Sequence, residues 1–477
     1  MHRVLFTLAV LLMLLLLACS TGAETDTTPT PVADTATVQP QPSPREQPAA
    51  IPSEESTRTA TMQTAVVPVE ETTTASASSP TEEPQQATAT KAASRTEFDR
   101  IAEDASEIRG LGIREDIRED YLTREQLRER LQKQFDEEYK PADAKADERA
   151  LSAFGLIPEN LDLRKLYLDL YTEQIAGFYD TETENMYVIS TGKRLNALGE
   201  LTYAHEVTHA LQDQHYDLDR LSKPYENKND DTLLSISALV EGDAVALQNE
   251  YLISKPALIG RIQDAFEEEQ ISSEKLGSAP PIISESLLFP YDAGARFVTA
   301  LRRDGGWRSV DAAYKAPPKS TEQILHPEKY TDRDTPTAVT IPDLGAVLGD
   351  GWAKLETNLF GEFQTRVLLE GQLDDAVARE AAAGWDGDGF VLWGKGEQDV
   401  VAWQTVWDSE DDAEQFAEAL REYDEARFDA SFEDVDGTLT LTADGQAATI
   451  RRTGTRVSYA LAPSEEIAPQ VLDALDR

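Results

Sequence analysis

The sequence has little cysteine and little positive charge. Its 477 residues include one cysteine, Cys19, so no disulfide can form within the chain and the fold must depend on packing, with or without a metal. Lysine and arginine number 44 against 88 aspartates and glutamates, a formal net charge of −44. Nucleic acid and anionic lipid headgroups both require basic clusters. The composition therefore argues against binding to nucleic acid or to charged membrane surfaces.

The apolar run at the N-terminus is too short to span a bilayer comfortably. It extends from Val4 to Leu17 after His2 and Arg3, which is typical of a signal peptide. The stretch Leu16-Leu17-Ala18-Cys19 resembles a bacterial lipobox. The resemblance implies that residues 1–18 are removed and that Cys19 carries a lipid at the extracytoplasmic face of a bacterial membrane, inner or outer. The alternative is an ordinary secretory signal with an incidental cysteine.

Residues 19–95 are poor in aromatic and large aliphatic side chains and rich in Thr, Pro, Ser, Ala and Glu. Such a segment cannot bury enough apolar surface to offset its ordering entropy. We expect a disordered tether there, followed by two folded regions. Residues 96–345 form the first, with a helical N-terminal part, and residues 346–477 form a small α+β domain of unknown role.

The hydrophobic pattern predicts an α+β fold that is mainly helical in its first region. Thr123 and Gln126 form a capping box that begins one helix. A β-hairpin is predicted over 177–189, and the four tryptophans at 385, 393, 403 and 407 are expected in core and strand positions. Further helices are predicted near 98–109, 144–154, 161–173, 198–215, 231–252, 257–269, 284–302, 355–383 and 409–424, and strands at 390–393, 400–403, 437–442, 446–452 and 456–461.

A metal-binding pattern, HExxH, occurs at 205–209 within the predicted helix 198–215. Positions i and i+4 share one face of a helix, so His205 and His209 can bind one Zn²⁺. Glu206 lies about 100° further round the helix, where it can reach a water held by the metal without binding the metal. Zinc lowers the pKa of such a water, and Glu206 can take its proton and pass it to a leaving amine.

A catalytic zinc site of this type needs a third protein ligand. His215 has a suitable spacing for a metzincin, but Gln212 stands where that class has a helix-ending glycine. Glu241 is the stronger candidate, because a carboxylate within the apolar helix 231–252 is costly to bury unless it is paired or coordinated. Both candidates remain open from the residues alone.

The pair of motifs, His205-Glu206-Val207-Thr208-His209 and Glu241-Gly242-Asp243-Ala244, resembles a gluzincin zinc peptidase over roughly residues 175–250. The resemblance implies a zincin-like fold, one zinc per chain held by His205, His209 and Glu241, and Glu206 as the general base. It also implies an edge strand that binds the substrate backbone, for which Tyr187, Val188 and Ile189 are the candidates; a core strand is as good an interpretation.

The chain departs from this family after the ligand glutamate. Thermolysin-like enzymes have an aspartate four residues later that orients a histidine, and Val245 occupies that position here. Asp243 is expected to face away. The groups that orient the ligands must then come from elsewhere, and Thr202, Gln212 and Asp213 are the candidates near the motif.

A hydrolytic site also gains from a hydrogen-bond donor to the oxyanion of the transition state. His326 and Tyr330 are the candidates, although a His-Pro pair in a loop is more often only structural. The predicted function is a peptidase that acts on protein or peptide outside the cytoplasmic membrane. The alternatives are a non-catalytic binding lipoprotein on the same scaffold and a hydrolase of cell-wall peptides.

Overall fold

The computed structural model describes residues 96–477 apart from 176, 190–194, 227–228 and 270–273. Cys19, the signal peptide 1–18 and the tether 19–95 lie outside the described residues, so these predictions stay predictions. Among the described residues, no helix is both long enough and apolar enough to cross a membrane.

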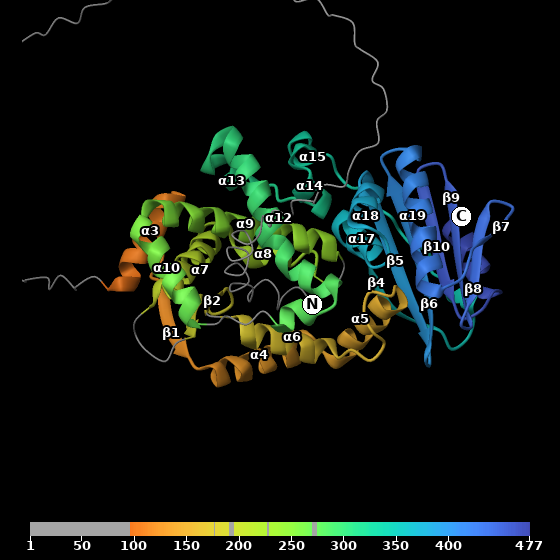
Figure 1. The fold of residues 1–477 in the computed structure, drawn as a ribbon, viewed down its shortest axis with the longest axis horizontal. Coiled ribbons are helices and arrows are strands. Elements are labelled where there is room, and N and C mark those ends of the chain that lie inside the picture. Colours follow the sequence, from red (N-terminus) through yellow and green to blue (C-terminus); the bar gives the residue numbers. More distant parts are fainter. Residues whose placement is uncertain (1–95, 176, 190–194, 227–228, 270–273) are drawn as a thin grey trace, which may run out of the picture. The chain divides into compact units, whose positions relative to one another are not determined.

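Helices dominate the chain up to residue 332. Thr96 and Thr123 each cap a helix. The threonine side chain accepts a hydrogen bond from the backbone amide of the third helical residue, and the side chain of that residue accepts one from the threonine amide. The capping box predicted at Thr123 is therefore confirmed. The helices are α3 Glu97–Arg109, α4 Arg124–Glu138, α5 Pro141–Ala153, α6 Leu163–Gln174, α7 Ala197–Tyr216, α8 Leu218–Ser222, α9 Asp230–Ser254, α10 Pro256–Glu269, α11 Glu274–Ser278, α12 Pro281–Gly305, α13 Trp307–Ala313, α14 Thr321–Leu325 and α15 Pro327–Asp332 (Figure 1).

A small sheet precedes α7, as the hairpin signal predicts. Strands β2 (Gly177–Asp180) and β3 (Asn185–Ile189) are antiparallel, and β1 (Arg118–Leu122) pairs with β3 in parallel. The strand order is β1-β3-β2, so β3 is the central strand. The interpretation of Tyr187, Val188 and Ile189 as an edge strand is therefore wrong and the alternative of a core strand is confirmed: β1, which the sequence analysis missed, pairs along the second side of β3.

The C-terminal region is built on a seven-stranded sheet of order β4-β5-β6-β10-β9-β8-β7. Residues 353–358 are strand β4, so the prediction of helix from 355 is wrong there; pairing with β5 decides the conformation of this largely polar segment. The elements are α16 Gly345–Leu348, β4 Ala353–Asn358, α17 Gly361–Glu370, α18 Asp375–Ala382, β5 Trp385–Lys395, β6 Gln398–Trp407, α19 Glu410–Phe428, β7 Glu433–Val435, β8 Thr438–Ala443, β9 Gln446–Thr453, β10 Arg456–Ala462 and α20 Ile467–Leu475.

Both faces of this sheet are covered. Along β5, Leu392 packs in the cluster that contains α17, α18 and α19, whereas its neighbours Val391 and Trp393 pack in the cluster that contains α20. This alternation is the period of a strand buried on both sides. Trp385, Trp403 and Trp407 lie with the first cluster, so all four tryptophans are buried strand residues, as predicted. The fold class is α+β.

The C-terminal sheet also receives a side chain from the helical region. Phe154, which follows α5, lies 4.7 Å from Phe360 and 5.5 Å from Trp403 between ring centroids, in edge-on contacts. Beside it, Arg149 pairs with Asp399 at 2.5 Å. Such aromatic contacts stabilise beyond the area they bury.

Helices α9 and α12 approach each other more closely than side chains normally allow. A Cβ on Gly242 would lie 2.2 Å from the carbonyl oxygen of Gly294, and a Cβ on Gly294 would lie 2.1 Å from that of Ala238. Only glycine permits such contact between backbones. The contact sets Glu241, the neighbour of Gly242, against the part of α12 that holds Tyr291.

Candidate metal centre

The HExxH residues lie in the most buried part of α7. Asn196 caps the helix by accepting from the Gly199 amide, and the helix then runs unbroken to Tyr216. His205 and His209 are 1 % and 8 % exposed, and their rings are 4.8 Å apart between centroids. The helix therefore presents both imidazoles on one buried face, as the spacing predicts.

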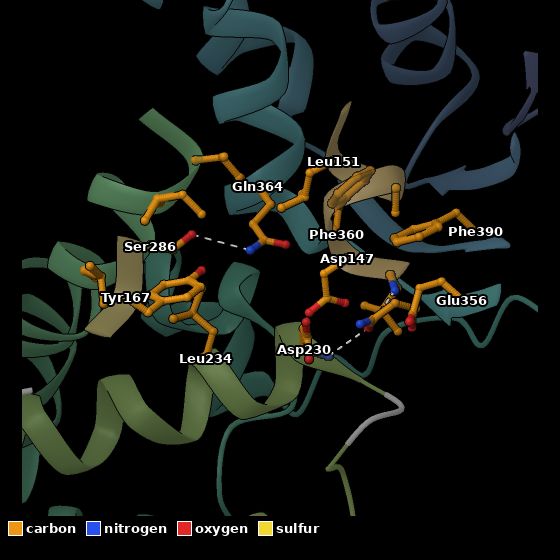
Figure 2. Close-up of a pocket in the computed structure, with 16 residues that line it drawn as sticks. Asp147, Leu151, Tyr167, Asp230, Leu234, Ser286, Glu356, Phe360, Gln364 and Phe390 are labelled. Carbon is orange, nitrogen blue, oxygen red and sulfur yellow. Dashed lines mark hydrogen bonds between the residues drawn. The ribbon is translucent and has the colours of Figure 1, made fainter. Parts of the chain in front are cut away.

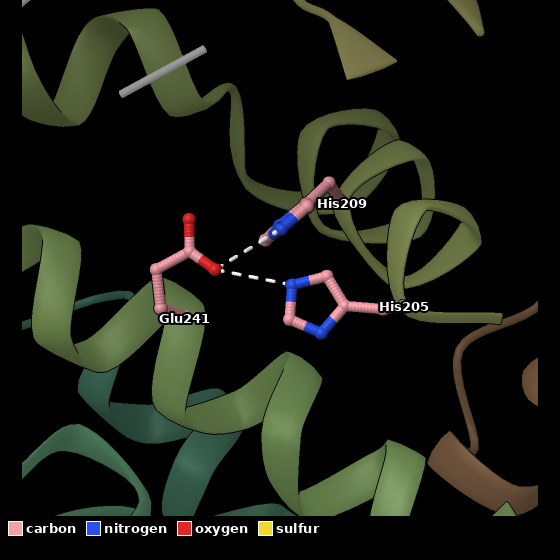
Figure 3. Close-up of side chains that lie close together, drawn as sticks. All are labelled: His205, His209 and Glu241. Atoms are coloured by element: carbon pink, nitrogen blue, oxygen red, sulfur yellow. Dashed lines mark hydrogen bonds and ion pairs between the residues drawn. The ribbon is translucent and has the colours of Figure 1, made fainter. Parts of the chain in front are cut away.

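Glu241 completes a group of three ligand-type side chains. Its Oε2 lies 3.1 Å from His205 Nε2 and 3.4 Å from His209 Nε2 (Figure 3). The ligand atoms of the three residues all lie within 4.8 Å of one another. His215 points elsewhere, with its Nε2 2.8 Å from the Gly112 carbonyl oxygen. The structure thus brings Glu241, and not His215, to the two histidines.

The three residues fit a metal ion. His209 Nε2 is buried and makes no hydrogen bond of good geometry among the described residues; it faces the Glu241 carboxylate at 3.4 Å, as His205 Nε2 does at 3.1 Å. A buried polar atom without a well-formed hydrogen bond is costly. Two imidazoles and one carboxylate are also a donor set that zinc accepts, with one position left for water. The group could hold a metal ion.

Without a metal, electrostatic attraction between the ligands replaces coordination. Burial alone would neutralise Glu241, but His209 and His205 beside it lower its pKa to about 2. Burial likewise opposes a charge on His209, and the carboxylate of Glu241 outweighs it and raises the His209 pKa to about 9. Burial lowers the pKa of His205. The metal-free pair is therefore an ion pair between Glu241 and His209.

Glu206 lies beside this group and contacts the small sheet. Its Oε2 accepts a hydrogen bond of 2.8 Å from the Tyr179 amide on β2, while its buried Oε1 has no hydrogen-bond partner in the described part of the chain. Burial, with the charge of Glu241 added, raises the Glu206 pKa to about 8. Strand β2 is an edge of the sheet, so the edge strand next to the site is β2 and not the predicted 187–189.

Tyr291 on α12 is a site residue that the sequence analysis missed. It is 1 % exposed, its ring lies 6.2 Å from the His205 ring between centroids, and its hydroxyl is buried beside the Glu241 carboxylate. Burial and then the charges of Glu241 and Glu206 raise its pKa well above the usual value, so the hydroxyl keeps its proton. In the sequence only Pro290, inside a predicted helix, marks this position as unusual.

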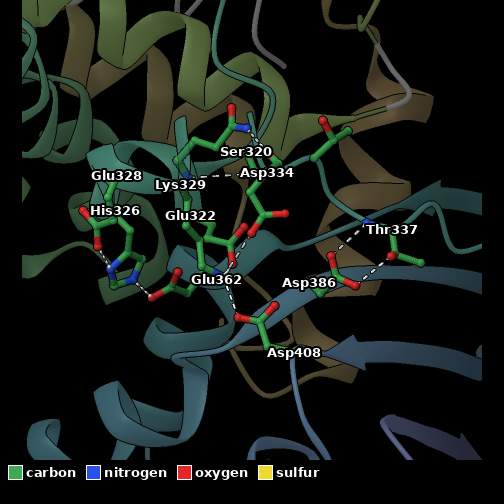
Figure 4. Close-up of polar contacts among 12 residues, drawn as sticks. Ser320, Glu322, His326, Glu328, Lys329, Asp334, Thr337, Glu362, Asp386 and Asp408 are labelled. Atoms are coloured by element: carbon green, nitrogen blue, oxygen red, sulfur yellow. Dashed lines mark hydrogen bonds and ion pairs between the residues drawn. The ribbon is translucent and has the colours of Figure 1, made fainter. Parts of the chain in front are cut away.

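The predicted oxyanion donors are engaged elsewhere. His326 Nε2 lies 2.9 Å from a carboxylate oxygen of Glu362, a contact that raises the His326 pKa (Figure 4). The Tyr330 hydroxyl donates to the Ala316 carbonyl at 2.9 Å. The structure does not bring either residue into the group of His205, His209 and Glu241 within the described residues.

Of the three candidates for orienting the ligands, Gln212 contacts one. Its Oε1 lies 2.9 Å from His209 Nδ1. Asp213 accepts from the Tyr179 hydroxyl at 3.1 Å and from the Leu218 amide at 3.0 Å, and Thr202 is buried on the same helix. Asp243 is not part of the group of three, but it is connected to His209 because it accepts a hydrogen bond of 3.0 Å from Gln212.

A second cavity lies among α5, α6, α9, α12 and β4 and contains none of the metal-ligand candidates. Its volume is about 50 Å³, and Asp147, Asp230 and Glu356 contribute carboxylates to an otherwise largely apolar lining (Figure 2). Burial, followed by the charge of Asp147, raises the pKa of Glu356 to about 7. A cavity of this volume has room for a few water molecules.

Comparison with known proteins concerns the other end of the chain. Residues 351–472 match the model of a domain of unknown function, DUF8575. No curated protein and no solved structure is detectably similar to the chain. The match covers the seven-stranded sheet and leaves α7, α9 and α12 outside it, so the metal centre must be interpreted from its own geometry.

Proposed function

We propose that the chain is a zinc-dependent peptidase that hydrolyses peptide bonds in protein or peptide substrates outside the cytoplasmic membrane. One observation carries the proposal: His205, His209 and Glu241 converge in a buried group with Glu206 beside it. The free oxygen of Glu206 is the feature that favours catalysis over a purely structural metal site, because a structural site needs no base.

Each residue of the centre has a role in this proposal. His205, His209 and Glu241 would hold one zinc ion, which supplies a Lewis acid that lowers the pKa of water and polarises the scissile carbonyl. Glu206 takes the proton of the attacking water on its unpartnered Oε1 and delivers it to the leaving nitrogen. Its other oxygen stays fixed by the Tyr179 amide. Burial of the centre strengthens each of these interactions.

One further residue would act on the substrate. The Tyr291 hydroxyl is protonated and buried beside Glu241, so it could donate to the oxygen that becomes negative in the transition state. The scissile bond would then lie between Glu206 and Tyr291.

The location is proposed from the sequence alone. The lipobox-like stretch that ends at Cys19 supports a lipid anchor at the outer face of a bacterial membrane, with residues 19–95 as the tether between anchor and enzyme. Labelling with a palmitate analogue tests it: the parent takes up label, and Cys19→Ala does not. Label on both proteins would contradict the anchor.

The catalytic proposal is tested with the full chain, prepared without chelators. We expect about one zinc per chain by elemental analysis and cleavage of casein. Glu206→Gln should keep the zinc and lose the cleavage, since it removes the base and leaves the ligands. Glu241→Ala should lose zinc, while the matched variant His215→Ala should keep both zinc and activity. Cleavage by Glu206→Gln at the parent rate would overturn the assignment.

A further inference from the structure

Gln212 connects a metal-ligand candidate to a buried carboxylate. It follows His209 by three residues on α7, and its Oε1 lies 2.9 Å from His209 Nδ1. Its Nε2 donates to the Val240 carbonyl at 3.0 Å and to Asp243 Oδ2 at 3.0 Å. All of these atoms are buried. Helix α9 therefore supplies both the ligand Glu241 and the groups that hold Gln212.

These contacts allow one orientation of the Gln212 amide. The Val240 carbonyl and the Asp243 carboxylate only accept hydrogen bonds, so the amide nitrogen must face them and the amide oxygen must face His209. The oxygen then accepts from Nδ1–H, so that in the neutral imidazole that binds a metal the lone pair of His209 is on Nε2, the nitrogen that faces Glu241. A rotated amide would place an oxygen against two acceptors in a buried site, at a large cost.

Asp243 depends in turn on Arg109. Both side chains are fully buried, with Arg109 Nε 2.6 Å from Oδ1 and Nη2 3.1 Å from Oδ2. The Tyr314 hydroxyl donates to Oδ2 at 2.9 Å. Arg109 is the last residue of α3 and lies over the ring of Trp307, 4.5 Å from its centroid. Burying a carboxylate is costly unless it is paired and hydrogen-bonded in this way.

We propose that Asp243 and Arg109 are positioning residues for the metal centre: acting through Gln212, they fix Nε2 of His209 as the nitrogen that faces the metal. The proposal rests on the proposed zinc site. Outer groups of this kind commonly change metal affinity 10–100-fold when they are removed. Here the Gln212 amide lies between the Asp243 carboxylate and His209, so Asp243 affects the histidine only indirectly. Because Arg109 is the last residue of α3, that helix also contributes to the site.

The competing explanation is that Arg109 and Asp243 form an ion pair that only stabilises the fold. That role predicts loss of stability without loss of zinc affinity in the molecules that stay folded. The measurement that separates the two is the zinc dissociation constant of the folded chain, obtained by competition with a chromogenic chelator. Circular dichroism at the same temperature confirms that each metal-free variant is folded.

The experiment uses the full chain and two substitutions. Gln212→Leu, which removes the acceptor for Nδ1–H, should raise the zinc dissociation constant about 10–100-fold. Asp243→Asn should raise it about 10-fold, because it removes the charge that holds Arg109 and offers Gln212 a donor in place of an acceptor. Asp399→Asn is the control. It breaks the Arg149–Asp399 pair, which lies outside this network, and should leave zinc affinity unchanged.

A double-mutant cycle tests the route. If Asp243 acts through Gln212, then Asp243→Asn should have little further effect on zinc affinity in the Gln212→Leu background, whereas independent effects would multiply. The absorption spectrum of the cobalt-substituted protein should change in both single variants and remain that of the parent in Asp399→Asn. Full multiplication of the two effects would overturn the proposed route.

Should Asp243→Asn fail to fold, Tyr314→Phe provides a milder change, since it removes one of the hydrogen bonds to Oδ2 and leaves the charge. It should weaken zinc binding a few-fold. Parent-like zinc affinity in Gln212→Leu and in Tyr314→Phe would refute the positioning role while leaving the peptidase proposal intact. Failure of the parent itself to bind zinc would instead remove the proposed function.

Discussion

Gly242 and Gly294 lie where α9 and α12 touch, and replacing Gly242 with alanine would force the two helices apart. The new Cβ would lie 2.2 Å from the Gly294 carbonyl oxygen, against ordinary contact at 3.4 Å or more, a shortfall of about 1.2 Å. Both contacting groups are backbone, so no flexible side chain can move aside. One helix must shift by roughly that distance.

The shift should act on the metal centre as well as on stability. Glu241 precedes Gly242, and metal–ligand distances tolerate about 0.2 Å of error. A displacement of about 1 Å therefore moves the carboxylate out of reach or tilts it, and we expect zinc affinity to fall at least about 10-fold. Overpacking of a buried contact costs about 1–3 kcal/mol, which lowers the free energy of unfolding by that amount.

The assay for Gly242→Ala combines urea unfolding of the metal-free chain with a zinc titration. Gly260→Ala on α10 is the control, because a Cβ at that exposed helical position meets nothing within 4 Å. It should stabilise the chain by up to about 1 kcal/mol through helix propensity and leave zinc binding unchanged. If Gly242→Ala binds zinc and unfolds like the parent, the close approach of α9 and α12 does not constrain Glu241 and the reasoning fails.

Three other predictions follow from the site and the second cavity. Tyr291→Phe should lower kcat for peptide cleavage about 10²–10³-fold with unchanged zinc content; an unchanged kcat would show that another group serves the oxyanion. Removal of zinc by a chelator should lower the Tm, because metal bound only by the folded state stabilises it, by about 2.7 kcal/mol at a free concentration of 100 times Kd; an identical Tm would contradict a native site. Glu356 has a folded pKa of about 7 against an ordinary 4.5, so its contribution to stability is present below pH 4.5 and is lost as pH rises through 7. Glu356→Gln should therefore stabilise the chain by about 1–2 kcal/mol at pH 8, after allowance for solvent screening, and little at pH 4; thermal melts at the two pH values that show equal effects would exclude the linkage.

The three metal-ligand candidates could be predicted from the sequence because each depends on local information. The spacing of four residues places His205 and His209 on one face of any helix. The apolar residues around Glu241 indicate from the sequence alone that a carboxylate there is costly to bury without a partner. His215 could be excluded as a ligand only from the structure. Its side chain contacts the Gly112 carbonyl, and a contact between segments so far apart in the sequence cannot be inferred from helical spacing.

The residues that sequence reasoning missed depend on contacts between distant segments. Tyr291 reaches the site because two glycines let α12 lie against α9, and nothing in the Phe289-Pro290-Tyr291 run indicates that contact. Asp243 was expected to face away because it follows Glu241 by only two residues on one helix. Its connection to His209 depends on Gln212 from α7, and its ion pair on Arg109 from α3, so helical periodicity alone could not predict either contact. Strand β1 carries few apolar residues and forms by pairing with β3.

Phe154 has a practical consequence for dividing this chain. The family match begins at residue 351, yet the ring that fills the aromatic cluster of that sheet comes from a helix almost two hundred residues earlier. A fragment cut at the start of the match would leave Phe360 and Trp403 facing solvent, and the remaining fragment would expose Phe154. Each fragment would then expose an apolar surface that promotes aggregation. Aggregation of a truncated protein would therefore not be evidence against the metal centre.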